Sequence, residues 1–168
     1  DSLVKATGAL IVQKSYECGI PLAVFGHATM SKRDEAPSMA PGERESGIGV
    51  LLATSGYLVV MPDYLGLGES DSSIIIHPYI SKFHQWFTTL NLLRATRQFA
   101  QNNAVDLNNQ LFVSGYSQGG HTTAAVQQLI EQDFSSEFAV TGAAPLSGPY
   151  DLINAQTEEI LTDSAYSA

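Results

Sequence analysis

The chain alternates between short runs of apolar residues and longer segments in which apolar and polar residues are mixed. The short runs are rich in branched side chains and stop at glycine, proline or polar clusters, a pattern that predicts buried β-strands. We expect strands at 8–14, 21–26, 57–64, 110–115 and 137–148.

The mixed segments have the periodicity of helices. It is clearest in 82–103, where one apolar stripe is formed by Phe83, Trp86, Phe87, Leu90 and Leu93. We expect further helices at 43–56, 118–132 and 149–162. Glu43 and Glu45 suit the first turn of the earliest of these helices, and Gly56 suits its C-terminal cap.

The order of these elements predicts the fold class. Strands with continuous apolar sequences that alternate with helices indicate an α/β protein, with a mostly parallel sheet and helices on both faces. The segments 31–43 and 65–73 are polar or rich in glycine and are expected to be loops. A chain of 168 residues fits one domain and can bury a core.

Charge and cysteine content narrow the function classes. Eight basic residues against 17 acidic ones leave a net charge of −9. Binding to phosphates needs clustered basic side chains, so we expect neither a nucleic-acid partner nor attraction to anionic membranes. No run reaches the roughly 18 apolar residues of a membrane span. The single cysteine, Cys18, is expected to be a buried free thiol, and the alternative is a disulfide partner on another polypeptide.

The stretch GYSQGG (115–120) lies between a predicted strand and a predicted helix. In that setting G-x-S-x-G forms a sharp turn that exposes the serine hydroxyl above the sheet edge. Ser117 is the candidate nucleophile, and Gly115 and Gly119 are expected because side chains there would clash across the turn. The backbone N–H of Gln118, at the helix N-terminus, points where an oxyanion would form. The alternative is a glycine-rich turn without a catalytic role.

A second candidate element, VFGHAT (24–29), follows the second predicted strand. In hydrolases with this architecture the loop after the corresponding strand supplies the other oxyanion N–H. Here the donor is expected to be Thr29 or, as the less favoured alternative, Ala28. We interpret His27 as a structural residue that braces the loop. Asp63 is expected to hydrogen-bond loop amides rather than to act in catalysis.

Four stretches carry a resemblance to a known family: GHAT, MPDYLGLGES, HPY and GYSQGGH, spread from residue 26 to residue 121. The sequence resembles an α/β-hydrolase and, more narrowly, secreted lipases and esterases of the secretory-lipase type. One position departs from the family pattern. The family usually has His-Gly-Thr in this loop, and here Ala28 replaces the glycine. If the usual glycine has a positive φ, alanine would alter the backbone of the loop.

The resemblance implies a triad in the chain order serine, acid, histidine. Acids follow Ser117, but the only histidine after it is His121, on the same predicted helix and poorly placed to reach the serine hydroxyl. His77 is expected to brace a loop and His84 to begin a helix. The family's sheet also continues with further strands after 137–148. We therefore expect residues 1–168 to be the N-terminal part of one α/β-hydrolase domain, with 149–168 starting a cap or the next helix.

The function expected from these residues is hydrolysis of carboxylic esters through an acyl-enzyme on Ser117. The acid and the histidine would come from polypeptide outside this chain, which alone would be inactive. The alternatives are a peptidase or amidase of the same fold, or a hydrolase fold reused as a binding module. No cofactor and no metal are expected, since no histidine or cysteine pair has ligand spacing and GLG (66–68) is not a dinucleotide motif. Resemblance favours a secreted or periplasmic protein.

Overall fold

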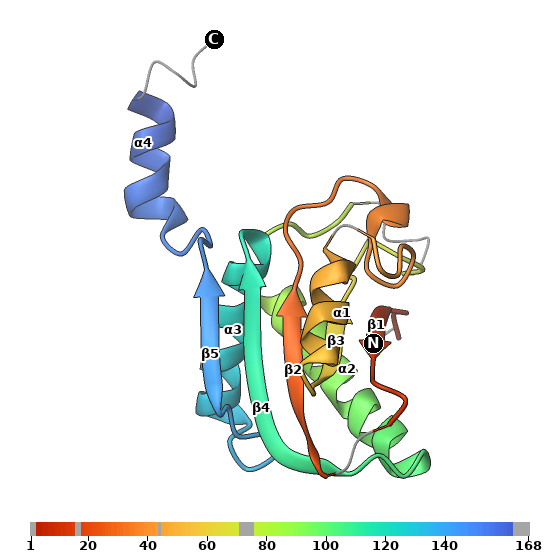
Figure 1. Ribbon diagram of the computed structural model, residues 1–168. Coiled ribbons are helices and arrows are strands. Elements are labelled where there is room, and N and C mark those ends of the chain that lie inside the picture. Colours follow the sequence, from red (N-terminus) through yellow and green to blue (C-terminus); the bar gives the residue numbers. More distant parts are fainter. Residues whose placement is uncertain (1–2, 16–17, 44, 71–75, 163–168) are drawn as a thin grey trace.

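A five-stranded sheet runs through the centre of the molecule (Figure 1). The computed structural model describes residues 3–15, 18–43, 45–70 and 76–162. The strands are Gly8–Ile11 (β1), Ile20–Gly26 (β2), Leu58–Pro62 (β3), Leu107–Tyr116 (β4) and Gly142–Leu146 (β5). In the order β1-β3-β2-β4-β5, β1 is antiparallel to β3 and all other neighbours are parallel. The predicted mostly parallel sheet is confirmed.

Helices cover both faces of the sheet. Helix α1 (Ser46–Thr54) packs on one face, while α2 (Lys82–Asn102) and α3 (Gln118–Asp133) pack against each other on the opposite face (Figure 1). A π-helical turn, η2 (Leu152–Gln156), leads into α4 (Thr157–Thr162), which extends away from the sheet (Figure 1). A short 3-10 helix, η1 (Arg33–Glu35), lies in the loop after β2.

Burial on both faces explains why the strands are apolar at successive positions. Along β2, Leu22 and Val24 belong to the core beneath α2 and α3, and Ala23 and Phe25 belong to the core beneath α1. The first core also holds Leu58, Val60, Leu90, Leu93, Val126 and Ile130. The second also holds Ala53, Val59 and Met61. Central strands with two buried faces are expected to have this composition.

Several predicted boundaries differ from the observed ones. Helix α1 begins at Ser46, so Glu43 and Glu45 precede its first turn instead of occupying it. The Ser46 hydroxyl donates to the carbonyl oxygens of Ala40 and Glu43, at 2.5 and 2.6 Å, and holds the chain in a turn until that point. The predicted helix 149–162 is α-helical only from Thr157, after the π-helical turn.

The strand expected at 137–148 is shortened at both ends to Gly142–Leu146. Before it, the backbone N–H groups of Glu137 and Phe138 both donate to the Phe134 carbonyl, which makes a turn after α3. Phe138 is buried, and the Arg97 guanidinium lies 3.8 Å from the centre of its ring. The apolar character of this segment therefore comes from packing under α2 and not from strand pairing.

The apolar stripe of α2 serves two environments. Leu90 and Leu93 are buried in the core, but Phe83 and Phe87 are 57% and 47% exposed. These two rings line a cavity of about 760 Å³ between α2, the N-terminal segment and the segment around Pro78. None of the helices in the described residues is long and apolar enough to cross a membrane. Cys18 is exposed, so the expected burial of its thiol is wrong.

Candidate active site

Ser117 lies at the junction between β4 and α3, where the chain turns sharply from strand to helix. Its backbone has φ 56° and ψ −115°, outside the regions that residues with a side chain usually occupy. Such a conformation costs on the order of 1–3 kcal/mol. The Ser117 N–H donates to the Leu146 carbonyl at 2.9 Å, which ties the turn to the end of β5. Among the described residues, its hydroxyl has no hydrogen-bond partner.

Two glycines allow the turn to pack against β2. A Cβ atom on Gly115 would lie 2.4 Å from the Gly119 carbonyl oxygen. A Cβ atom on Gly119 would lie 1.8 Å from the Gly26 carbonyl oxygen, well inside the contact distance of the two atoms. Backbone therefore meets backbone where β2, β4 and α3 converge, and only glycine fits at these positions.

Gln118 is the first residue of α3. Its backbone N–H is one of the groups at a helix N-terminus that have no intrahelical acceptor. Its side chain is fully buried, and the amide nitrogen Nε2 lies 2.6 Å from Nε2 of His77. The amide oxygen Oε1 has no hydrogen-bond partner among the described residues. The side chain is thus directed toward the segment that contains His77.

The direction of the bond between Gln118 and His77 follows from the second ring nitrogen. His77 Nδ1 lies 2.7 Å from the Leu65 carbonyl, which can only accept, so Nδ1 carries the proton. Burial lowers the pKa of His77, which keeps the ring neutral at pH 7. Nε2 therefore has a lone pair and accepts from the Gln118 amide. The ring also stacks on Tyr64, with 5.8 Å between centroids.

The loop after β2 carries His27, Ala28 and Thr29. His27 is fully buried, and burial lowers its pKa, so the neutral ring has one N–H. Nδ1 is 2.6 Å from the Ala28 carbonyl and Nε2 is 3.3 Å from that of Asp63, so the proton is best placed on Nδ1. The ring lies 4.3 Å from that of Tyr64. His27 braces the loop, as the sequence predicts.

The backbone N–H groups of Ala28 and Thr29 differ in their hydrogen-bond partners. The Ala28 N–H donates to the Glu45 carboxylate at 2.6 Å, so this N–H is already engaged. No acceptor contacts the Thr29 N–H among the described residues, and its hydroxyl lies 2.7 Å from that of Tyr79. Ala28 is not among the residues with positive φ, so alanine fits the loop here without left-handed strain. Of the two expected donors, Thr29 is the one whose N–H has no acceptor in the part of the chain that the structure describes.

All four histidines of the chain have a side-chain partner other than the Ser117 hydroxyl. Besides His27 and His77, His84 Nδ1 lies 2.7 Å from the Ser81 hydroxyl, and His121 Nδ1 lies 2.6 Å from Oε1 of Gln85. Burial lowers the pKa of His121. None of these nitrogens has the Ser117 hydroxyl as a hydrogen-bond partner. Within the described residues, the structure assembles no serine–histidine pair.

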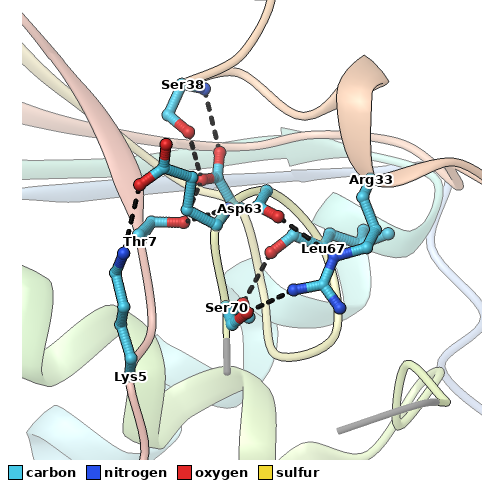
Figure 2. Close-up of polar contacts among 9 residues, drawn as sticks. Lys5, Thr7, Arg33, Ser38, Asp63, Leu67 and Ser70 are labelled. Atoms are coloured by element: carbon cyan, nitrogen blue, oxygen red, sulfur yellow. Dashed lines mark hydrogen bonds and ion pairs between the residues drawn. The ribbon is translucent and has the colours of Figure 1, made fainter. Parts of the chain in front are cut away.

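Asp63 is a buried structural carboxylate at the end of β3. Figure 2 shows the donors that surround it. The Thr7 hydroxyl donates to Oδ2 at 2.6 Å, and Ser38 donates its N–H to Oδ1 at 2.9 Å and its hydroxyl to Oδ2 at 2.5 Å. Nearby, the Arg33 guanidinium donates to the carbonyl oxygens of Gly68 and Ser70 (Figure 2). As predicted, Asp63 hydrogen-bonds a loop amide.

The site holds no cluster of metal ligands. In residues 3–15, 18–43, 45–70 and 76–162, no three histidine, cysteine or carboxylate side chains gather where they could hold a metal ion. Ser117, Gln118 and Thr29 are not among the residues that line the 760 Å³ cavity.

The mostly parallel sheet and the strand–turn–helix junction at Ser117 define the α/β-hydrolase class. The chain belongs to the secretory lipase family, whose model matches residues 45–167. The family resemblance predicted from the sequence is therefore confirmed. Comparison with curated protein sequences gives no match.

Solved structures agree on the fold. The rice cell wall degrading esterase LipA from Xanthomonas oryzae is 37% identical, with a TM-score of 0.77. A provisionally assigned hydrolase from Legionella pneumophila is 26% identical, with a TM-score of 0.81. Each match covers 89% of this chain and 39% of the other chain, so this chain spans well under half of these relatives. Candida antarctica lipase A shares the fold, with 20% identity and a TM-score of 0.57. That match covers 82% of this chain and 32% of the lipase chain.

Three contacts at the site were not predicted from the sequence. They join Glu45 to Ala28, Tyr79 to Thr29, and the Gln118 side chain to His77. Each links residues at least 17 positions apart, and no local pattern encodes such a pairing. The sequence contains only an indirect signal for these contacts. The motifs GHAT, HPY and GYSQGG occur in one chain, and parallel topology brings segments that follow different strands to one edge of the sheet.

Proposed function

We propose that this chain carries the nucleophile of an enzyme that hydrolyses carboxylic esters. The observation that supports this most directly is the left-handed backbone of Ser117 at the strand–helix junction, with φ 56°. A strained nucleophile on such a turn is a recurring device of α/β-hydrolases. The strain keeps the hydroxyl accessible, and the helix that begins at Gln118 directs its N-terminal N–H groups toward the same region.

The proposed reaction has two stages. The Ser117 oxygen bonds to the acyl carbon while its proton passes to a histidine, and the N–H groups of Gln118 and Thr29 stabilise the oxyanion. The ester C–O bond then breaks, and the alcohol leaves with the proton from the histidine. In the second stage the histidine takes a proton from water, and the resulting hydroxide attacks the acyl-enzyme. The carboxylic acid is released and the serine regains its proton.

The histidine and the acid of this mechanism are proposed to come from polypeptide outside these 168 residues. This is supported by the contacts of the four histidines, each of which has another partner. It also agrees with the 39% of the LipA chain that the match covers. Residues 1–168 would then be one part of a single hydrolase domain and inactive alone.

The substrate is proposed to be an acylglycerol or another ester with a short to medium acyl chain. The family description, secretory lipase, supports esters over amides, and the relative from Xanthomonas oryzae is described as a cell wall degrading esterase. Comparing p-nitrophenyl esters with aminoacyl anilides in the complete enzyme discriminates between the two. Faster turnover of the anilides would make the enzyme an amidase.

Secretion is proposed on the same family description. Fractionation of the producing cells, with the enzyme detected by antibody, tests it. The enzyme is expected in the medium, and retention in the cytoplasm would contradict the proposal.

A fluorophosphonate probe tests the nucleophile in the complete enzyme. We expect stoichiometric labelling, with the modified peptide containing Ser117 and labelling abolished in Ser117→Ala. Ser114→Ala is a matched control from β4, since the Ser114 hydroxyl donates to the Ala144 carbonyl at 3.0 Å. This variant should label like the wild type. A folded, complete wild-type enzyme that does not label would refute the proposed function.

A further inference from the structure

Residues from three separate segments form a connected set above the sheet edge. Gln118 comes from the start of α3, Thr29 from the loop after β2, and His77 and Tyr79 from the HPY segment between β3 and α2. The Gln118 amide donates to His77 at 2.6 Å, and the hydroxyl groups of Tyr79 and Thr29 lie 2.7 Å apart. The rings of His77 and Tyr79 meet edge to face, with 6.1 Å between centroids.

We propose that His77 and Tyr79 are positioning residues that hold the two oxyanion donors, Gln118 and Thr29, in a fixed relation to each other. The inference rests on the proposed function, because it concerns the same oxyanion. The two donors belong to segments 89 residues apart in the chain (29 to 118), and no hydrogen bond joins them directly among the described residues. The HPY segment contacts both, so it links the two donors in addition to the backbone packing of α3 against β2. Donors must lie within a few tenths of an ångström of their place to stabilise an oxyanion well.

The hydrogen bond between His77 and Gln118 has a defined direction. Nδ1 of His77 is committed as a donor to the Leu65 carbonyl, so Nε2 must accept from Gln118. The buried Gln118 oxygen, which has no partner among the described residues, indicates what the arrangement costs. An unsatisfied buried polar atom destabilises a protein. An apolar side chain at this position would remove that oxygen but would leave Nε2 of His77 without its donor, so the glutamine and the histidine form a matched pair.

The contact between Tyr79 and Thr29 consists of one pair of hydroxyl groups. Tyr79 is 50% exposed, so its ring contributes little to the core. Removing the hydroxyl in Tyr79→Phe keeps the ring against His77 and breaks only the contact to Thr29. This makes Tyr79→Phe a variant that is expected to fold, whatever happens on substitution of His77.

Variants of His77 separate positioning from simple packing. In His77→Gln, the amide oxygen can take the place of Nε2 and accept from Gln118. In His77→Asn, the amide nitrogen can take the place of Nδ1 and donate to Leu65, but the chain is too short to reach Gln118. The positioning role therefore predicts that glutamine preserves function better than asparagine, although both remove the aromatic ring.

The experiment uses the complete enzyme and measures kcat and KM on a p-nitrophenyl ester and the rate of fluorophosphonate labelling. We expect His77→Asn to lower kcat and the labelling rate by about 10- to 100-fold, with KM changed less than about 2-fold. Tyr79→Phe should lower them by about 5- to 10-fold. His77→Gln should stay within about 5-fold of the wild type. The double variant Tyr79→Phe/Thr29→Val should have the same kcat and labelling rate as Tyr79→Phe alone, because the contact between the two hydroxyl groups is already lost.

The outcomes distinguish this inference from the proposed function. A wild-type enzyme that does not react with the probe overturns the proposed function and, with it, the inference. If the wild type reacts and Tyr79→Phe and His77→Asn match its rates, only the inference is overturned. Equal losses in His77→Gln and His77→Asn would also overturn it, because packing alone would then explain His77.

Discussion

Gly26 and Gly119 meet backbone to backbone, so closely that a Cβ atom on Gly119 would lie 1.8 Å from the Gly26 carbonyl oxygen. Gly26 ends β2 and Gly119 is the second residue of α3. A Cβ on Gly26 would in turn lie 2.9 Å from the Gly119 Cα. This contact brings the start of α3, and with it Ser117, next to the loop that begins at His27.

Gly119→Ala is therefore expected to be one of the most damaging single substitutions in the chain. The added methyl group meets backbone and not a movable side chain, so the free energy of unfolding should fall by about 3 kcal/mol or more. Gly47→Ala is the matched control in α1, where the nearest atom, the Gly42 carbonyl oxygen, would be 3.6 Å from the new Cβ. This control should be neutral or stabilising by up to about 1 kcal/mol. Chemical denaturation measures both, and similar values for the two would contradict the steric account.

Asp63→Asn should destabilise the protein without affecting turnover by the folded enzyme. The carboxylate accepts from the Thr7 hydroxyl and from both donors of Ser38, and an amide NH₂ would face some of these donors. We expect a loss of about 3 kcal/mol. The exposed Asp34→Asn, with an expected change within about 0.5 kcal/mol, is the control. If kcat per folded molecule fell more than 10-fold, Asp63 would have a catalytic role after all.

Ala28→Gly tests the departure from the family pattern. Ala28 does not have a positive φ, so glycine relieves no strain there and only increases the freedom of the unfolded chain. The free energy of unfolding is expected to fall by about 0.4–1 kcal/mol. A thermal or denaturant melt of both proteins provides the measurement. A stabilised glycine variant would mean that the loop prefers a left-handed backbone.

The contribution of the buried histidines to the stability of the protein should decrease as the pH falls below about 6.5. Burial lowers the pKa of His27, so the unfolded chain takes up a proton at a higher pH than the folded protein does. Between the pKa of the unfolded chain and the lower pKa of the folded protein, the unfolded state binds more protons. A fall in pH through this window therefore favours the unfolded state. Each such histidine contributes a slope of at most about 1.4 kcal/mol per pH unit. His77 and His121 shift in the same direction.

His27→Asn isolates one part of this slope. Asparagine can keep a donor near the Ala28 carbonyl but does not titrate, so the pH dependence between pH 5 and pH 7 should be shallower than in the wild type. Unfolding curves at several pH values give the slope independently of the absolute loss of stability. Parallel slopes for the two proteins would show that His27 does not contribute.

Local pattern was sufficient for most of the fold. The central strands β2 and β3 were predicted because both of their faces are buried and every position then favours apolar residues. Where the same apolar signal has another cause, prediction fails. Phe138 is apolar because it packs under Arg97 in a turn, and the segment before Gly142 is therefore not a strand. The exposure of Cys18 is likewise decided by neighbours that the sequence does not name.

The sequence alone determined the position of the strand–turn–helix junction at Ser117 and the family to which the chain belongs, because tight turns and helix starts depend on residues within a few positions of each other. The role of Ser117 as a nucleophile stays a prediction. Only the tertiary structure decided that the Ala28 N–H donates to Glu45, that the Thr29 N–H has no acceptor among the described residues, and that His77 accepts from Gln118. These are contacts between distant segments, and their geometry is set by how the strands pack side by side.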